Sequence, residues 1–294
     1  ETPKGPPADT FRRNAVPQTI NTNLVSLNAQ RNLSTSQSAL ATSMQRLSSG
    51  LRVNSAKDDA AGLAIAERMH TQVRGMNVAM RNANDGISLA QVAEGALGKT
   101  GDIFQRMREL AVQAANGTNS DSDRLSLNEE FTQLAQEATR TLGGTQFNNQ
   151  NILASTNTST FQIGANDVSD VNQITVAGFS WTQAAGVTDV LGTTILTGTS
   201  GPTLTIGGSD GSAAVLALTS LDTAINTINS QRGTFGAVQN RFENVVATLM
   251  VASENQSAAR SRIMDADYAA ETASLSRAQI LQQAGNAMVA QANQ

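Results

Sequence analysis

The stretch RLSSGLRVNSAKDDAAGLAIAERM, residues 46–69, decides the fold of this chain. It opens as a helix, is interrupted at SSG, becomes polar at NSAKDD and resumes as an alanine- and leucine-rich helix. We expect Asn54, Ser55 or Asp58 to cap the second helix, with Asp58 and Asp59 favourable at its positive end. The stretch is therefore interpreted as a polar hinge between two helices.

Upstream of this hinge, apolar residues recur on one helical face. From Leu33 onward the steps are 7, 4, 3 and 4, the heptad spacing of helices that pack against other helices. Near the other end of the chain, the run TASLSRAQILQQAGNAMVAQ carries a similar narrow apolar stripe. The seam predicted from the two runs consists of Leu33, Leu40, Met44, Leu47, Leu51, Leu275, Leu281 and Met288.

Downstream of the hinge, the spacing predicts a helix from about residue 84 to 115 and a return helix around 127–138. The segment NGTNSDSD between them is a strong turn signal, so the two form an antiparallel hairpin. A further helix is expected from about residue 221 to 263. Between residues 160 and 220 we expect four short strands in a modest, surface-exposed module: TFQIGA, NQITVAGF, PTLTIGG and AAVLALT.

The predicted fold class is mainly α with a small β region. An elongated helical bundle and coiled coil is formed by the N- and C-terminal segments, and a central β-rich module projects from it. The terminal seams are narrow and made mostly of alanine, leucine and methionine. A pair of such helices buries too little apolar surface to be very stable alone. We therefore expect it to gain stability by stacking on copies of itself, as repeat units do.

Composition excludes several classes of function. The net charge of −4 predicts no nucleic-acid partner, and the absence of cysteine excludes disulfides and thiolate metal sites. The single histidine, His70, is not part of the HExxH motif of a zinc site, and we interpret it as an ordinary polar helix residue. The adjacent carboxylates Asp58 and Asp59, and Glu129 and Glu130, point in different directions on a helix, which argues against a catalytic dyad. We therefore expect the protein to have no enzymatic activity and to bind neither a cofactor nor a metal ion.

Several long stretches of the chain resemble bacterial flagellin, the subunit of the flagellar filament. They cover most of residues 17–155 and 220–294 in the family's order. The matching stretches are INTNLVSLNAQRNL, the 46–69 hinge, RNANDGISLAQVAEGAL, QRMRELAVQAANGTNSDSDR, TQFNNQNIL, GAVQNRFENVV and ARSRIMDADYAAETASLSRAQILQQAGNAMVAQANQ. In this family the hinge connects an inner coiled-coil domain to an outer helical bundle.

The resemblance implies a domain organisation. Three domains are expected. Residues 17–57 plus 264–294 form a terminal coiled-coil filament-core domain, residues 58–159 plus 221–263 form a helical bundle, and residues 160–220 form a variable surface-exposed β-rich domain. Residues 1–16 have no family counterpart, and we expect a disordered leader or residues added by cloning. The short apolar tail that follows AQANQ in relatives is missing here, which is expected to weaken filament packing and chaperone binding.

The resemblance also implies function, location and partners. The protein is expected to be secreted, exported as an unfolded chain and assembled into the extracellular flagellum for motility. Its implied partners are copies of itself, the flagellar export apparatus, an export chaperone, and cap and junction proteins. An animal Toll-like flagellin receptor is a further implied partner. The residues that match the patch it contacts in flagellin are Arg106, Leu110, Gln113 and Glu130.

Two alternative functions remain open at this point. A hook–filament junction protein shares terminal helices with flagellin, although RELAVQAANGTNSDSD favours flagellin itself. A flagellin-like surface protein could instead hold a cell-surface glycan, such as an acidic polysaccharide, or a host receptor. Trp181 and Phe179 are the only aromatic pair that supports a sugar site, and no basic residues cluster around them in the sequence.

Overall fold

The computed structural model describes residues 23–154, 156, 158–167, 169–192 and 204–292. The predicted leader, residues 1–16, lies outside this part of the chain. The chain divides into two compact units. The terminal unit comprises residues 1–67 and 260–294, and the central unit comprises residues 68–259.

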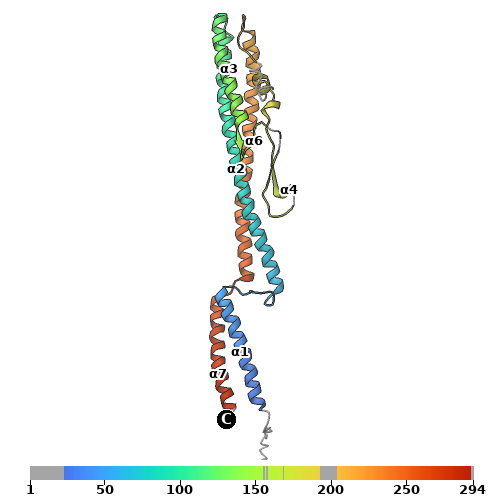
Figure 1. The fold of residues 1–294 in the computed structure, drawn as a ribbon, viewed down its shortest axis with the longest axis vertical. Helices are drawn as coiled ribbons and strands as arrows, with labels where there is room; N and C mark the ends of the chain where they lie inside the picture. The colour runs from blue at the N-terminus through green and yellow to red at the C-terminus, as the bar shows by residue number, and fades with distance from the viewer. Residues whose placement is uncertain (1–22, 155, 157, 168, 193–203, 293–294) are drawn as a thin grey trace, which may run out of the picture. The chain divides into compact units, whose positions relative to one another are not determined.

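Two helices from opposite ends of the chain make up most of the terminal unit. Helix α1, Leu24–Ser49, and helix α7, Tyr268–Ala292, lie side by side (Figure 1). Helix α1 begins where the Asn23 side chain accepts hydrogen bonds from two backbone nitrogens of the first turn, and it ends at Gly50, whose φ of +71° suits glycine. The prediction that the two chain ends pair as helices is confirmed.

The hinge between α1 and the next helix is held by two neighbouring aspartates. The Asp58 carboxylate accepts hydrogen bonds from the backbone nitrogens of Asn54 and Ser55 and from the Ser55 hydroxyl, and the Ser55 bonds lower the pKa of Asp58. The Asp59 carboxylate accepts from the Gly62 nitrogen at 2.8 Å and so caps the next helix. The predicted caps Asn54, Ser55 and Asp58 are therefore wrong, because these three residues form the turn before the helix. Asp59 lies at the N-terminal end of the helix, as expected.

Short backbone pairing joins the hinge to the segment before α7. Leu51 and Asp265 form an isolated antiparallel bridge. The backbone nitrogen of Arg52 donates to the Met264 carbonyl at 2.6 Å. Beneath this pairing a small apolar cluster is centred on the buried side chains of Val53, Ala66 and Met264.

The central unit is built on three helices that lie side by side (Figure 1). They are α2, Ala60–Ala114, α3, Asp121–Gly144, and α6, Ser212–Met264. Helices α2 and α3 form the predicted antiparallel hairpin. Helix α2 is continuous from Ala60, so the helix predicted from residue 84 is its second half. The core contains Leu97, Phe104, Met107, Leu110, Phe131, Leu142, Phe235 and Phe242.

Close packing of α2 on α6 depends on glycine. A Cβ atom on Gly86 would lie 2.6 Å from Cζ of Phe242, which is shorter than any normal contact between such atoms. The Phe242 ring packs edge-on against Phe161, with ring centroids 5.4 Å apart. Gly86 thus lets the ring of one long helix lie directly against the backbone of the other.

Two small antiparallel hairpins follow α3. Strands β1, Gln146–Phe147, and β2, Gln150–Asn151, are joined by two asparagines with φ of +48° and +64°. Positive φ at both central residues is the condition for the type I′ turn that two-residue hairpins favour. Strands β3, Ser159–Gln162, and β4, Gln173–Val176, pair in the second hairpin, with helix α4, Ser169–Asn172, between them.

Two of the four predicted strands are wrong. Residues 213–219, AAVLALT, form the start of α6, because Ala214, Ala217 and Leu221 recur at helical spacing and are all buried. In PTLTIGG, residues 204–208 contain no strand, and residues 202–203 lie outside the described residues. The predictions TFQIGA and NQITVAGF are confirmed by β3 and β4.

The segment after β4 is more buried than expected for the surface-exposed module that the sequence predicted. It contains the 3-10 helix η1, Trp181–Gln183, and helix α5, Val187–Leu191. Trp181 and Val190 are fully buried and belong to the same apolar cluster as the three long helices. The segment therefore packs onto the bundle with its large side chains inward, rather than standing as a separate surface module.

Candidate functional site

The terminal unit leaves many large apolar side chains in contact with solvent. On α1 and α7 only Ser26, Ser43 and Ala278 are buried among the described residues. We call the exposed leucine, isoleucine, valine and methionine side chains of the two helices the terminal apolar surface; it comprises Leu24, Val25, Leu27, Met44, Ile280, Leu281 and Met288, with exposed fractions between 42% and 68%. Exposed apolar side chains in this number on two paired helices mark an interaction surface.

Part of this surface is hollowed into a groove between the two helices. The groove encloses about 500 Å³ and is lined by Leu24, Val25, Asn28, Ala29, Asn32, Ser36, Leu281, Ala284, Gly285 and Met288. Gly285 allows the helices to approach, because a Cβ atom there would lie only 3.2 Å from Cδ1 of Leu33. None of the ten lining residues is charged. The groove therefore fits an apolar side chain of another protein segment better than an ion or a sugar.

The eight predicted seam residues fall into two groups. Leu33, Leu40, Leu47, Leu51 and Leu275 are partly buried within the terminal unit, whereas Met44, Leu281 and Met288 are 57%, 51% and 60% exposed. Burying a large apolar side chain completely contributes about 1.5–3 kcal/mol. A surface that covers the second group would therefore add substantially to a helix pair that is marginal alone.

A polar patch lies on the α2–α3 hairpin of the central unit. The Arg106 guanidinium donates to Glu130 at 2.8 Å and to Glu109 at 3.0 Å, and hydrogen bonding to Glu130 raises the pKa of Arg106. Arg106, Glu130 and Gln113 are exposed. Leu110 is only 1% exposed and lies in the core, so its side chain does not contribute to the exposed surface of this patch.

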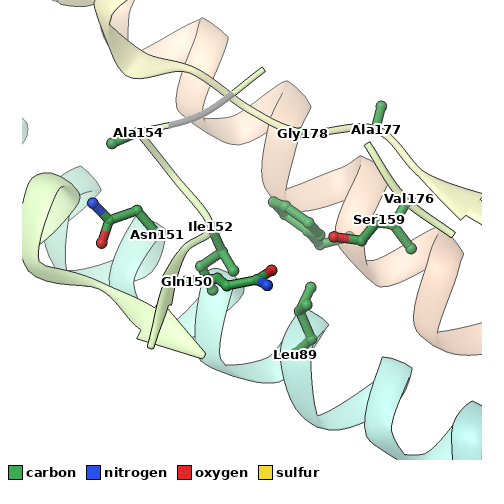
Figure 2. A pocket seen from close by; sticks show the side chains of 10 residues that line it. Leu89, Gln150, Asn151, Ile152, Ala154, Ser159, Val176, Ala177 and Gly178 are labelled. Atoms are coloured by element: carbon green, nitrogen blue, oxygen red, sulfur yellow. The ribbon is translucent and has the colours of Figure 1, made fainter. Parts of the chain in front are cut away.

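A third candidate is a cavity of about 460 Å³ beside the two hairpins of the central unit. Figure 2 shows Gln150 and Ile152 on one side of it, Ser159 and Val176 on the other, and Leu89 at its base. The ten lining residues include no charged side chain, so the cavity offers nothing that would pair with an acidic polysaccharide. It has the mixed amide, hydroxyl and apolar lining of a site for a small neutral group.

The aromatic pair considered for sugar binding does not form a site. Trp181 is fully buried and Phe179 is 8% exposed, so neither ring presents a face to solvent. Among the described residues, no group of histidines and carboxylates is arranged to hold a metal ion. In the same part of the chain, no helix has both the length and the apolar character needed to cross a membrane.

The class of protein follows from these features. The helix pair of the terminal unit leaves large apolar side chains exposed, which is typical of a subunit that binds other protein chains. Comparison with known proteins identifies the family. Residues 20–158 match the bacterial flagellin N-terminal helical region, and residues 218–294 match the bacterial flagellin C-terminal helical region.

Individual relatives cover nearly the whole chain. A flagellin of Halalkalibacterium halodurans is 44% identical over 280 residues, which span 94% of this chain and 96% of the relative. The flagellar filament 33 kDa core protein of Treponema phagedenis is 43% identical over 286 residues, with the same coverage. A crystal structure of Bacillus cereus flagellin is 31% identical, covers 57% of this chain and 88% of that chain, and superposes with a TM-score of 0.46.

The chain belongs to the bacterial flagellin family. It is a structural subunit that polymerises into the flagellar filament, and its location is therefore the extracellular flagellum. The names of the relatives do not favour the two alternatives considered from the sequence, a hook–filament junction protein and a cell-surface binding protein.

Proposed function

We propose that the terminal apolar surface is the surface through which one subunit binds the next in the filament. In this proposal residues 17–57 and 264–294 form the filament core, and residues 58–159 and 221–263 form the surrounding helical bundle. Residues 160–220, of which Trp181 and Val190 pack onto the bundle, lie on its outward side. The observation that carries it is the exposure of Met44, Leu281 and Met288 on helices that bury so few of their own side chains.

Export and folding fit this arrangement. The subunit leaves the cell as an unfolded chain through the export apparatus, held beforehand by an export chaperone, and meets cap and junction proteins at the growing filament. The terminal helices gain much of their stability only when neighbouring subunits cover them, so folding of this unit and assembly are coupled. The absence of cysteine suits passage of an unfolded chain, because no disulfide can form before export. The subunit has no enzymatic role in this proposal.

Replacing Leu281 and Met288 together by asparagine tests the proposed interface. We expect filament growth from seeds to be abolished while the isolated variant keeps the wild-type helical content, because both side chains are already more than half exposed. Growth is measured by sedimentation and by electron microscopy of seeded reactions. The matched control is Leu216→Asn, a 68% exposed leucine on α6 of the central unit, which is expected to polymerise. Normal growth of the double variant would contradict the proposal.

We also propose that the polar patch of Arg106, Gln113 and Glu130 binds an animal Toll-like flagellin receptor, with Leu110 supporting it from the core. An exposed arginine held in place by two carboxylates is pre-organised for such an interface.

Arg106→Ala tests receptor binding. We expect loss of most receptor signalling by the soluble subunit, measured in a cell reporter assay, because the variant removes the central charge of the patch. Arg140→Ala is the matched control, since Arg140 is also exposed, lies on α3 and pairs only with Glu137 in the described structure. Equal signalling by Arg106→Ala and wild type would exclude this patch as the receptor site.

A further inference from the structure

We propose that Asn116, in the loop between α2 and α3, is a self-modification site at which the side-chain amide is converted to isoaspartate and aspartate. The reaction is intramolecular attack by the Gly117 backbone nitrogen, followed by hydrolysis with water. This inference concerns the chemistry of the α2–α3 loop and does not depend on the proposed assembly surface.

The sequence and the loop geometry meet the first requirement, access to the attacking nitrogen. Asn116 precedes the glycine in the only Asn-Gly pair of the chain, and its side chain is exposed. A Cβ atom built on Gly117 has no neighbour within 4 Å, so the space around this peptide is open. Among the described residues, the Gly117 nitrogen donates no hydrogen bond, and it is therefore free to react.

The loop also activates the carbonyl that is attacked. The backbone nitrogen of Thr118 donates to Oδ1 of Asn116 at 3.3 Å. This bond folds the side chain back over the intervening Gly117 peptide, as in an Asx turn. A donor on the carbonyl oxygen also stabilises the negative charge that develops there during attack, in the manner of an oxyanion hole. Polarisation therefore acts on the carbon atom that is attacked, Cγ of Asn116.

The step balances without an outside oxidant or reductant. The Gly117 nitrogen loses its proton to solvent and forms a bond to Cγ of Asn116. The bond between Cγ and Nδ2 breaks, and the amide nitrogen leaves as ammonia after gaining a proton from solvent. The product is a five-membered succinimide. Water then opens either carbonyl: opening at Cγ gives aspartate, and opening at the former backbone carbonyl gives isoaspartate.

Arg124 directs the second step toward isoaspartate. Its side chain is only 4% exposed, and its Nη2 donates to the Asn116 backbone carbonyl at 3.3 Å. Polarisation favours attack by water on that carbonyl. In isoaspartate the same atom becomes part of a free carboxylate, which is a stronger acceptor for a guanidinium than a neutral carbonyl. The new negative charge also lies near the N-terminus of α3, where negative charge is favourable.

The experiment follows modification during incubation of the folded subunit in mildly alkaline buffer. Trypsin releases residues 109–124 as one peptide, which contains both Asn116 and Asn119, so the second asparagine is an internal control. Peptide mass spectrometry locates the one-dalton gain, and enzymatic methylation of isoaspartyl carboxylates identifies the isomer. We expect modification at Asn116 to be at least about tenfold faster than at Asn119, because glycine leaves the attacking nitrogen unhindered.

Gly117→Ala is the matched variant. The open space around Gly117 means that the variant keeps the fold, which circular dichroism checks, while the added Cβ hinders attack. We expect modification at Asn116 to fall to the rate at Asn119. Equal rates at the two asparagines in the wild-type protein, or an unchanged rate in the variant, would overturn the proposal. The isoaspartate fraction is expected to be higher in the folded protein than in the urea-unfolded chain; equal fractions would exclude the directing role of Arg124.

Discussion

Gly86→Ala is expected to lower the free energy of unfolding of the central unit by up to about 2 kcal/mol, although alanine is normally the better helix former. Alanine in a helix interior gains roughly 1 kcal/mol over glycine. Here the new methyl group would lie 2.6 Å from Cζ of Phe242, a ring that is fully buried and packed edge-on against Phe161. Overpacking of a core costs about 1–3 kcal/mol, which outweighs the gain in helix propensity.

The matched control is Gly95→Ala on the same helix. A Cβ atom at Gly95 has no neighbour within 4 Å, so this variant is expected to raise stability by about 0.5–1 kcal/mol. Urea unfolding is followed by the fluorescence of Trp181, the single tryptophan of the chain, which is fully buried in the central unit. Equal stabilisation by the two substitutions would show that α2 and α6 do not pack as closely at Gly86 as described.

Arg124→Ala is expected to lower the free energy of unfolding of the central unit by about 3 kcal/mol. The buried guanidinium donates to the backbone carbonyls of Ala114, Asn116 and Ser209, and so joins the end of α2 to the segment before α6. Truncation removes the arginine donor from the three carbonyl groups, of which the Asn116 carbonyl keeps a second donor, the Asn119 nitrogen. A buried polar group that loses its partner costs about 1–3 kcal/mol.

Arg140→Ala controls for loss of an arginine on the same helix. Arg140 is largely exposed and pairs only with Glu137 in the described structure, so we expect no measurable change in the urea midpoint. The comparison separates a buried hydrogen-bonding role from a general effect of charge. A midpoint for Arg124→Ala equal to that of Arg140→Ala would rule out the three carbonyl contacts as a significant source of stability.

The spacing of apolar residues in the sequence was enough to predict the long helices, because residues such as Leu33, Leu40 and Leu47 recur on one helix face over many turns. It failed at AAVLALT, residues 213–219, where seven residues are too few to distinguish a buried strand from the start of a buried helix. None of the three candidate caps, Asn54, Ser55 and Asp58, is the cap, because Asp58 and Asp59 are the same residue type and the sequence does not distinguish them. Only the hydrogen bonds of the folded hinge distinguish them.

The candidate sites were harder to predict than the elements that carry them. Arg106 and Leu110 lie four residues apart, a spacing that places two residues on one helix face, and the resemblance assigned both to one contact patch. In the structure the long arginine side chain reaches solvent, while the shorter leucine points into the core between the helices. The burial of Arg124 was not predicted, because an arginine that follows the polar sequence SDSD is expected to lie in a solvent-exposed turn. Its burial depends on carbonyl groups of two other segments, which no local pattern shows.

The central claim is that the two terminal helices are completed by neighbouring copies of the chain. Amide hydrogen exchange of the dilute subunit and of the filament, compared peptide by peptide, tests it most directly. In the dilute subunit we expect rapid exchange across α1 and α7 and slow exchange in the core of α2, α3 and α6; in the filament, α1 and α7 become strongly protected. Protection of α1 and α7 in the dilute subunit equal to that of the central helices would contradict the account.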